Sequence, residues 1–257
     1  MSDMPMVPLG PLTVSRFIVG GNPFSGGSHQ TAELSARMRD WWTVARIKEA
    51  LAEAERLGVN TFLGRGDNFI TRLLNEYWNE GGTIQWIAQT CPERASVEAN
   101  IRGIHAAGAK ACYLHGGMCD RVFRDGDPES LRPWIALIRE LGMVPGMGTH
   151  NCRNPLRAEE MDLGCDFYMC CFYDLISRGG EIYEEEDREA MARTIRAIRK
   201  PCIAFKIMAA GRNEPVSAFR FAFENIKPSD PVCVGIYTED QPHQVAENVA
   251  LTIRFGS

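Results

Sequence analysis

Two histidines and a lysine in this sequence follow short apolar runs, at positions where their side chains could transfer protons or bind a polar ligand. The stretch KACYLHGG, residues 110–117, ends an apolar run with His115 and two glycines, and His150 ends the next such run. An imidazole changes its charge near neutral pH, so it can act as a general acid or base or bind a metal ion. Lys206 stands between two apolar residues, and a lysine is almost never buried without a partner. We therefore expect its ammonium group to face a site.

Polar residues that end other apolar runs extend this set. They are Asn22, Arg65, Asp67, Gln89, Thr90, Asn151, Cys170, Cys171 and Tyr237. Such side chains suit a small polar or sugar-like molecule, although Asp67 could simply pair with Arg65 or Lys206. The other three histidines fall in a predicted loop or in predicted helices, and we interpret them as surface residues: His29, His105 and His243.

Eight apolar runs are predicted to be β-strands, because Gly, Pro or Asn flank them. They span residues 16–22, 59–64, 84–90, 111–116, 143–151, 166–172, 202–208 and 232–237. Between the strands, apolar residues recur at helical spacing, as in Ile47, Leu51 and Ala54. The motifs DPES at Asp127 and NPLR at Asn154 each predict a helix start, with a capping residue followed by Pro.

Strands that alternate with helices predict a parallel sheet covered by helices, and eight such units in 257 residues predict an α/β fold of the (β/α)8 TIM-barrel type. The competing interpretation is a doubly wound open sheet, but GGNPFSGG after the first strand lacks the GxGxxG spacing of that fold. We expect one barrel domain over residues 1–257. In such barrels the C-terminal strand ends form the site, so the polar residues above should meet at one opening.

Composition and charge limit the classes of partner. The net charge is −5 without a basic cluster, which argues against nucleic acid, and no run approaches the ~20 apolar residues of a membrane span. The first ten residues lack the pattern of a signal peptide, so we expect a cytoplasmic protein whose nine cysteines are reduced. A small-molecule substrate is the expected partner, and no oligomeric state is predicted.

The order of several motifs resembles that of the aldo/keto reductase family over nearly the whole chain. LGPLTVSRFIVGGNPFSGG, CYLHGG, MCCFYDLISRG and CIAFKIMAAGR resemble the family's opening hairpin with its first strand and its fourth, sixth and seventh strands, and ALAEAERLGVNTFL resembles its second helix-strand unit. QVAENVAL resembles the closing helix, in which Glu and Asn hold the adenine of the nicotinamide cofactor. The resemblance implies an aldo/keto reductase-like barrel that binds NAD(P), with Glu247, Asn248 and Gly235 on the cofactor side and His115 as the active-site histidine.

Three of the four catalytic residue types of that family are absent at the positions that the resemblance assigns. The family reduces carbonyls with a Tyr general acid tuned by Asp and Lys, while a His orients the carbonyl. Here Leu63 stands at the Asp position, Asn68 at the Tyr position, and Gln89 or Thr90 at the Lys position. Because an amide is far too weak an acid to replace the Tyr, classical NADPH-dependent carbonyl reduction is not expected.

The cofactor side also departs from the family pattern. The family usually offers Lys or Arg after the eighth strand for the adenosine 2′-phosphate, whereas this chain has Glu239 and Asp240. These acids would repel a phosphate, but they suit a cofactor with a free ribose diol. In the family a small residue lies beside the nicotinamide. Lys206 stands at that position in this chain, where its side chain could fill the pocket or change its charge.

Three functional hypotheses follow. The first is an NAD(P)-dependent oxidoreductase with an altered tetrad that uses His115 as its acid. The second is a different barrel enzyme, an isomerase or lyase, in which Lys206 forms a Schiff base or in which His115 and His150, with Asp67 or a Cys, hold a divalent metal ion. No HxH or HExxH spacing supports the metal. The third is a non-catalytic ligand-binding barrel, and the chemistry of the residues slightly favours the second.

Overall fold

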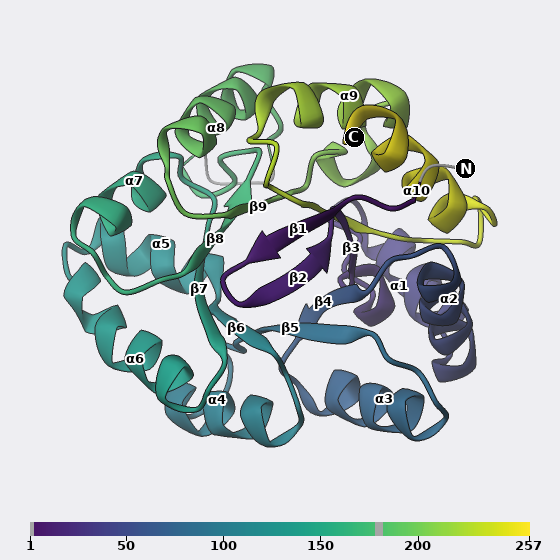
Figure 1. Ribbon diagram of the computed structural model, residues 1–257, viewed down its shortest axis with the longest axis horizontal. Helices are drawn as coiled ribbons and strands as arrows, with labels where there is room; N and C mark the ends of the chain where they lie inside the picture. The colour runs from purple at the N-terminus through teal and green to yellow at the C-terminus, as the bar shows by residue number, and fades with distance from the viewer. Residues whose placement is uncertain (1–2, 178–181) are drawn as a thin grey trace.

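The centre of the molecule is a closed barrel of eight parallel strands, seen in a computed structural model that describes residues 3–177 and 182–257 (Figure 1). The strands follow the order β10-β3-β4-β5-β6-β7-β8-β9 around the barrel. Their bounds are β3 (Phe17–Gly20), β4 (Thr61–Arg65), β5 (Gln85–Gln89), β6 (Ala111–Leu114), β7 (Val144–Thr149), β8 (Phe167–Cys171), β9 (Cys202–Phe205) and β10 (Val232–Gly235). All eight predicted strands are therefore present, and the predicted (β/α)8 barrel is confirmed.

Helices surround the barrel, and each strand is followed by at least one of them (Figure 1). They are α1 (Ala32–Trp41), α2 (Val44–Arg56), α3 (Asn68–Asn79), α4 (Val97–Ala106), α5 (Gly116–Arg124), α6 (Arg132–Glu140), α7 (Arg153–Glu160), α8 (Glu185–Ala197), α9 (Pro215–Asn225) and α10 (Gln244–Phe255). Two strand exits carry an additional helix, because α1 precedes α2 after β3 and α5 precedes α6 after β6. In the described part of the chain, no helix combines the length and apolar character needed to cross a membrane.

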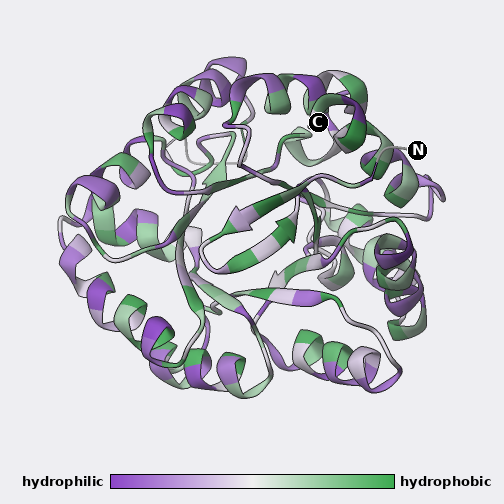
Figure 2. Ribbon diagram, in the orientation of Figure 1, coloured by the Kyte–Doolittle hydropathy of each residue, from purple (hydrophilic) through white to green (hydrophobic). Residues whose placement is uncertain are grey.

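The helices bury one apolar face against the barrel, as their spacing predicts. On α2 the predicted face of Ile47, Leu51 and Ala54 is buried, and the hydropathy colouring shows helices with one apolar and one polar side (Figure 2). A fully buried aliphatic side chain is worth about 1.5–3 kcal/mol relative to an exposed one. The helical layer therefore stabilises the strands whose ends carry the candidate site.

Neither of the two predicted capping residues caps a helix. Asp127 precedes a short 3-10 helix, η2 (Pro128–Leu131), and its side chain makes no capping hydrogen bond. Helix α7 begins two residues earlier than the motif predicts, so Asn154 lies within its first turn and is buried. Its Nδ2 instead donates a hydrogen bond to Asp120, 2.8 Å away, on α5. The side chain therefore donates to a tertiary acceptor, whereas a cap would have accepted from the local backbone.

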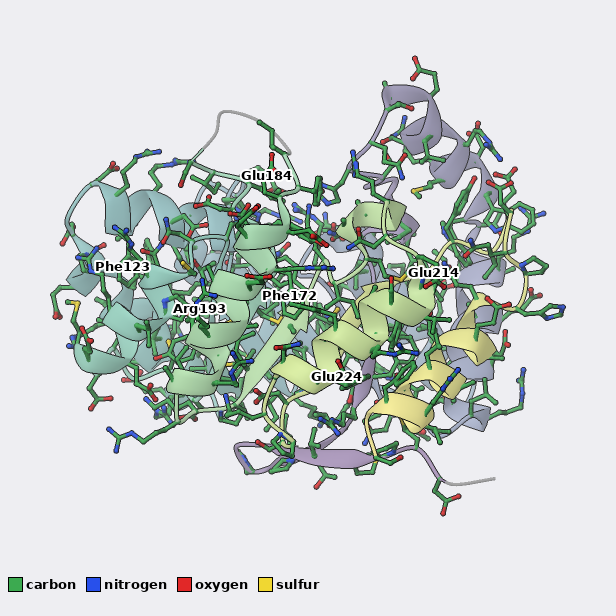
Figure 3. All side chains as sticks on the ribbon, turned by 90° about the horizontal axis from the view of Figure 1, so that it is seen from above. Phe123, Phe172, Glu184, Arg193, Glu214 and Glu224 are labelled. Carbon is green, nitrogen blue, oxygen red and sulfur yellow. The ribbon has the colours of Figure 1, made fainter. Side chains whose placement is uncertain are left out.

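An antiparallel hairpin covers the N-terminal end of the barrel. Strands β1 (Met6–Leu9) and β2 (Leu12–Ser15) pair directly, and the turn between them places Gly10 at a φ of +60°. The hairpin side chains Val7, Leu9 and Val14 pack with residues of the barrel interior. The hairpin lies across the barrel axis in Figure 1, and in the side view it lies at the end opposite the rim that carries Glu184 (Figure 3). Only the C-terminal end of the barrel remains open to a ligand.

The interior of the barrel becomes more polar toward its open end. Successive residues of a strand point to opposite faces, so alternate positions line the interior. Interior residues such as Ile18, Ile87 and Phe167 are fully buried together with the hairpin residues. Nearer the C-terminal ends, Gln89 and Tyr113 line a cavity instead. The strands thus form both a buried apolar layer next to the hairpin and the floor of the cavity at the open end.

Candidate functional site

A cavity of about 350 Å³ opens at the C-terminal ends of the strands. Five of the predicted site residues lie in its wall: Asn22, Gln89, Lys206, Gly235 and Tyr237. Apolar side chains complete the inner part of the wall, including Leu63, Met169 and Phe205. Four of these five, Asn22, Gln89, Lys206 and Tyr237, are the polar strand-end residues that line this one cavity.

Glycines bring the backbone close to the cavity where β3 and β10 end. A Cβ atom at Gly21 would lie 2.8 Å from the ring of Phe62, and one at Gly235 would lie 2.8 Å from the ring of Pro23. Real Cβ atoms do not approach other heavy atoms so closely, so both positions require glycine unless the neighbouring ring moves. The rim between these two strands is consequently formed mainly by backbone.

His29 is not a simple surface residue, contrary to the prediction. It is half-buried, it lines the cavity, and its Nε2 lies 3.2 Å from the side-chain nitrogen of Asn22. It takes a left-handed φ of +56°, which turns the chain before α1. His105 and His243 are exposed as predicted, although His243 precedes α10 rather than lying within it.

Tyr113 is a site residue that the sequence analysis missed. It lines the cavity, and its hydroxyl accepts a hydrogen bond from Gln89 Nε2 at 2.9 Å. Burial raises the pKa of Tyr113 well above its ordinary value. The phenol therefore keeps its proton and can donate a hydrogen bond to a ligand, but it is a poor proton donor. Strict alternation along β6 would have identified it as an inward-facing side chain.

Lys206 forms part of the cavity wall and does not fill the cavity. The residue follows β9 directly and takes a left-handed φ of +58°. Its ammonium nitrogen lies 3.4 Å from the hydroxyl of Tyr183 and 5.9 Å from the centre of that ring. Tyr183 belongs to the segment between β8 and α8, so the ammonium group turns toward that side of the opening. The expectation that it faces a site agrees with this position.

His150 belongs to a buried hydrogen-bonded cluster centred on Asp120, a residue of α5 that the sequence analysis did not single out. Asp120 is 2% exposed, and its Oδ2 lies 2.8 Å from His150 Nδ1. His150 is outside the cavity wall, but its ring centre lies 5.8 Å from that of Phe205, which lines the cavity. No local pattern links residues 30 positions apart, because only the packing of α5 against β7 brings them together.

His115 follows β6 and also lies outside the cavity wall. Its backbone N–H donates to Thr90 Oγ1 at 3.0 Å, and its Nδ1 is buried without a hydrogen-bond partner among the described residues. Burial is the main cause that lowers the pKa of His115 to about 4, and the neighbouring His150 and Arg65 lower it further. At neutral pH this imidazole is uncharged, so it suits hydrogen bonding to a ligand better than donating a proton.

The lowered pKa of His115 predicts a loss of stability in mild acid. The unfolded histidine has a pKa near 6.5 and the folded one about 4, so between these values the unfolded chain binds the extra proton. We expect the free energy of unfolding to fall by about 2 kcal/mol more in the wild type than in His115→Gln between about pH 7 and about pH 5. Urea unfolding at both pH values measures this difference, and equal losses in the two proteins would contradict it.

Several other predicted site residues are engaged in local structure. Asp67 caps α3 by accepting from Ile70 N at 2.9 Å, and it also pairs with Arg65 at 3.3 Å. Asn151 Oδ1 accepts from the backbone of Arg153, the first residue of α7, at 2.9 Å. Cys170 and Cys171 are fully buried. Within residues 3–177 and 182–257, no three His, Cys, Asp or Glu side chains are grouped to hold a metal ion.

The positions that correspond to the aldo/keto reductase tetrad carry no replacement acid. Leu63 is 7% exposed and lines the cavity, whereas Asn68 begins α3 and accepts a hydrogen bond from Arg94 at 2.8 Å. Thr90 is engaged with the backbone of His115. A proton donor for carbonyl chemistry must therefore come from elsewhere in the site.

Two of the three residues predicted on the cofactor side line a second cavity next to the first, whereas Gly235 lines the first. This groove of about 380 Å³ includes Glu247 and Asn248 of α10 in its wall. Asn248 is 2% exposed, and its side-chain Nδ2 has no hydrogen-bond partner in the described part of the chain. The two cavities share Pro215, Gln241 and Gln244 as wall residues, so they adjoin each other across the loop after β10.

The acidic residues after β10 are tied to α1. Arg37 lies 2.8 Å from Glu239 and 3.1 Å from Asp240, and Tyr237 donates its hydroxyl proton to Glu239. Trp41 Nε1 also donates to Thr238 Oγ1 at 3.1 Å. Arg37 therefore faces two carboxylates, and the nearby Arg46 also helps to lower the pKa of Glu239.

Comparisons with solved structures agree with the barrel topology. A Pseudomonas aeruginosa protein provisionally described as an aldo-keto reductase superposes with a TM-score of 0.69 at 18% identity, covering 98% of this chain and 96% of that one. A second structure of this description from the same organism gives a TM-score of 0.68 at 18% identity over 98% and 95%. This chain has the aldo-keto reductase fold. The same fold relates it to a glycerol dehydrogenase from Gluconobacter oxydans, with a TM-score of 0.56, 10% identity and coverage of 98% and 96%. Comparisons with family models and with curated proteins found no match.

Proposed function

We propose that this protein is an oxidoreductase that uses a nicotinamide dinucleotide to interconvert a small polar carbonyl compound and its alcohol. One observation carries the proposal: the cavity in the barrel mouth adjoins a groove whose wall contains a buried, unpartnered amide. Leaving a buried donor unpaired costs about 1–3 kcal/mol, so a ligand that accepts from it gains affinity. An elongated site of this kind suits a two-part ligand better than a compact one.

The residues present fit a dinucleotide. Asn248 and Glu247 would hold the adenine end in the groove, and Gly235 and Gly21 let the nicotinamide end approach the backbone at the barrel mouth. When bound, the nicotinamide would supply or accept a hydride. Lys206 leaves room for it, because the cavity of about 350 Å³ exists with this side chain in place.

The charge of the rim favours NAD(H) over NADP(H). Glu239 and Asp240 both pair with Arg37, so a 2′-phosphate placed there would meet two carboxylates. A free ribose diol can instead donate hydrogen bonds to carboxylates. The sequence left NAD(H) and NADP(H) both open, and this arrangement of charges supports NAD(H).

The cavity favours a small polar substrate. Its wall combines the polar side chains of Gln89, Tyr113 and Asn22 with the apolar side chains of Met169 and Phe205. The fold is shared with a glycerol dehydrogenase, which supports short aldoses and polyols as the first compounds to test. We favour this oxidoreductase over a metal-dependent enzyme because the described residues form no three-ligand group.

The proposal predicts that Asn248→Leu weakens dinucleotide binding without destabilising the fold. The leucine removes an unpartnered donor, so the free energy of unfolding should be unchanged or higher. We expect the Kd for NAD(H), measured by calorimetry, to rise about tenfold, the equivalent of one hydrogen bond to the ligand.

Asn100→Leu is the matched control. Asn100 is also a buried asparagine, but its side chain accepts from Cys91 N at 2.8 Å and donates to Gly66 O at 2.8 Å. This variant should lose stability and keep its affinity for NAD(H). No binding of NAD(H) or NADP(H) by the wild type would overturn the proposed function.

Lys206 supports a second candidate function, a Schiff-base isomerase or lyase. Its amine lies in the cavity wall, where it could add to a carbonyl carbon, with loss of the carbonyl oxygen as water to give an imine. Borohydride treatment with dihydroxyacetone would then fix the adduct on Lys206, detectable by mass spectrometry and absent in Lys206→Met. An adduct in a protein that binds no dinucleotide would favour this candidate over the first.

A further inference from the structure

We infer that Asp120 and His150 form the proton-transfer pair of the reaction, an inference that rests on the oxidoreductase function proposed above. The tetrad positions supply no acid, and the pair is assembled from α5 and from the end of β7. His150 would exchange the proton with the substrate oxygen, and Asp120 would be a positioning residue.

Asp120 is saturated by donors. Its Oδ1 accepts from Thr149 Oγ1 at 2.6 Å and from Asn154 Nδ2 at 2.8 Å. Its Oδ2 accepts from the backbone N–H of His150 at 3.0 Å and lies 2.8 Å from Nδ1 of the same residue. The carboxyl side chain is fully buried. It can be buried because these donors provide hydrogen bonds to both of its oxygens.

These contacts fix the tautomer of His150. A carboxylate that already accepts three hydrogen bonds can only accept again, so Nδ1 of His150 must carry the proton. The lone pair of the neutral imidazole is then at Nε2, the nitrogen that Asp120 does not engage. A histidine oriented by a buried aspartate in this way is the arrangement that serine hydrolases use for proton transfer.

His150 is placed where Nε2 can reach a ligand in the barrel mouth. It directly follows β7, and the neighbouring strands β6 and β8 supply Tyr113 and Met169 to the cavity. Its ring contacts Phe205, which lines the cavity, and its side chain is 15% exposed. Gly116 leaves space for the ring, because a Cβ atom there would lie 2.9 Å from His150 Cε1.

The other candidate proton donors are less suitable. Burial lowers the pKa of His115 to about 4, so its protonated form is scarce at neutral pH. Burial raises the pKa of Tyr113, which therefore releases its proton with difficulty. Asp67 is engaged in capping α3 and in pairing with Arg65. Among these groups, His150 is the one whose ring nitrogen is held by a buried carboxylate.

The proton step balances within the proposed reaction. When bound, the dinucleotide would take up or supply the hydride. In the alcohol-oxidising direction, the substrate O–H bond breaks as its proton passes to the lone pair at Nε2 of His150, and the C=O bond forms as the hydride leaves the carbon. The ring then carries a proton on both nitrogens and releases the one at Nε2 to water. Reduction is the reverse: Nε2 first takes a proton from water and then passes it to the carbonyl oxygen, which restores the Nδ1–H form.

The tautomer can be measured without turnover. Nitrogen-15 NMR of imidazole-labelled protein at neutral pH should show His150 as the Nδ1–H form in the wild type. In Asp120→Asn the amide offers donors to the ring and to Asn154, so the Nδ1–H signal should be lost. Thr149→Val removes one bond to Asp120 and leaves the contact with the ring, so it should keep the signal. Retention of the Nδ1–H form in Asp120→Asn would overturn the positioning role.

Kinetics separate this inference from the proposed function. With a short aldose that the wild type reduces with NADH, Asp120→Asn and His150→Gln should lower kcat about 10²–10⁴-fold, with KM and the Kd for NADH within threefold of wild type. His150→Gln keeps a donor for Asp120, so it provides the test if Asp120→Asn does not fold. Exposed His105→Gln is the control and should retain full turnover. Wild-type turnover in both site variants overturns the inference alone, whereas a wild type that binds no dinucleotide overturns the proposed function as well.

Discussion

Replacing Asp230 with asparagine is expected to lower the free energy of unfolding by about 3–5 kcal/mol. Asp230 is fully buried just before β10, and its carboxylate lies 3.0 Å from Lys227 Nζ. It also accepts from the backbone of Cys202 at 3.0 Å and of Lys227 at 3.1 Å. The amide would leave a half-buried ammonium without its counter-charge. Urea unfolding at neutral pH measures the loss.

Replacing Lys227 and Asp230 together should be less destabilising than replacing Asp230 alone. Burial raises the pKa of Asp230 more than Lys227 lowers it, so the attraction of the lysine does not fully offset the loss of hydration. A buried ion pair of this kind adds little net stability, although breaking it is costly. The double variant Lys227→Met with Asp230→Asn should therefore be more stable than Asp230→Asn alone. If the two losses simply added, the ion pair would not be the cause.

Replacing Gly116 with valine is expected to lower kcat about 10²-fold, because it displaces the imidazole of His150. The Cβ atom would lie 2.9 Å from His150 Cε1 and 3.3 Å from the backbone nitrogen of Thr149, so the ring must move away from Asp120. Gly116 begins α5 with an ordinary φ, so the backbone itself accepts a side chain. Steady-state kinetics and the Nδ1–H signal of His150 should change together.

Graded and neighbouring substitutions provide the controls for Gly116→Val. Gly116→Ala adds only the Cβ atom and should have a smaller effect in the same direction. Gly117→Ala approaches His115 Cε1 at 3.3 Å instead, so it should keep the Nδ1–H form of His150. If Gly117→Ala and Gly116→Val lowered kcat equally, the loss would follow from the start of α5 in general and not from His150.

The sequence alone determined the architecture and the end of the barrel that carries the site. Apolar runs and apolar helix faces are local, periodic signals, so eight predicted strands with helices between them predicted a barrel. The resemblance of QVAENVAL to a cofactor-binding helix likewise located Asn248 in what proved to be the wall of the second cavity. Lys206 and Gln89 were predicted from their places at strand ends, and both line the main cavity.

Only the tertiary structure decided which polar residues act together. Asp120, His150 and Asn154 lie on α5, after β7 and on α7, and no spacing in the sequence links them. The sequence instead predicted a helix cap for Asn154 and a role in the site for Asp67. The carboxylate of Asp67 in fact caps α3. The periodicity of a sequence indicates only the contacts of a residue with others a few positions away along the chain. Closure of the barrel brings separate rim segments together, and the packing of α5 beside β7 gives His150 its buried partner Asp120.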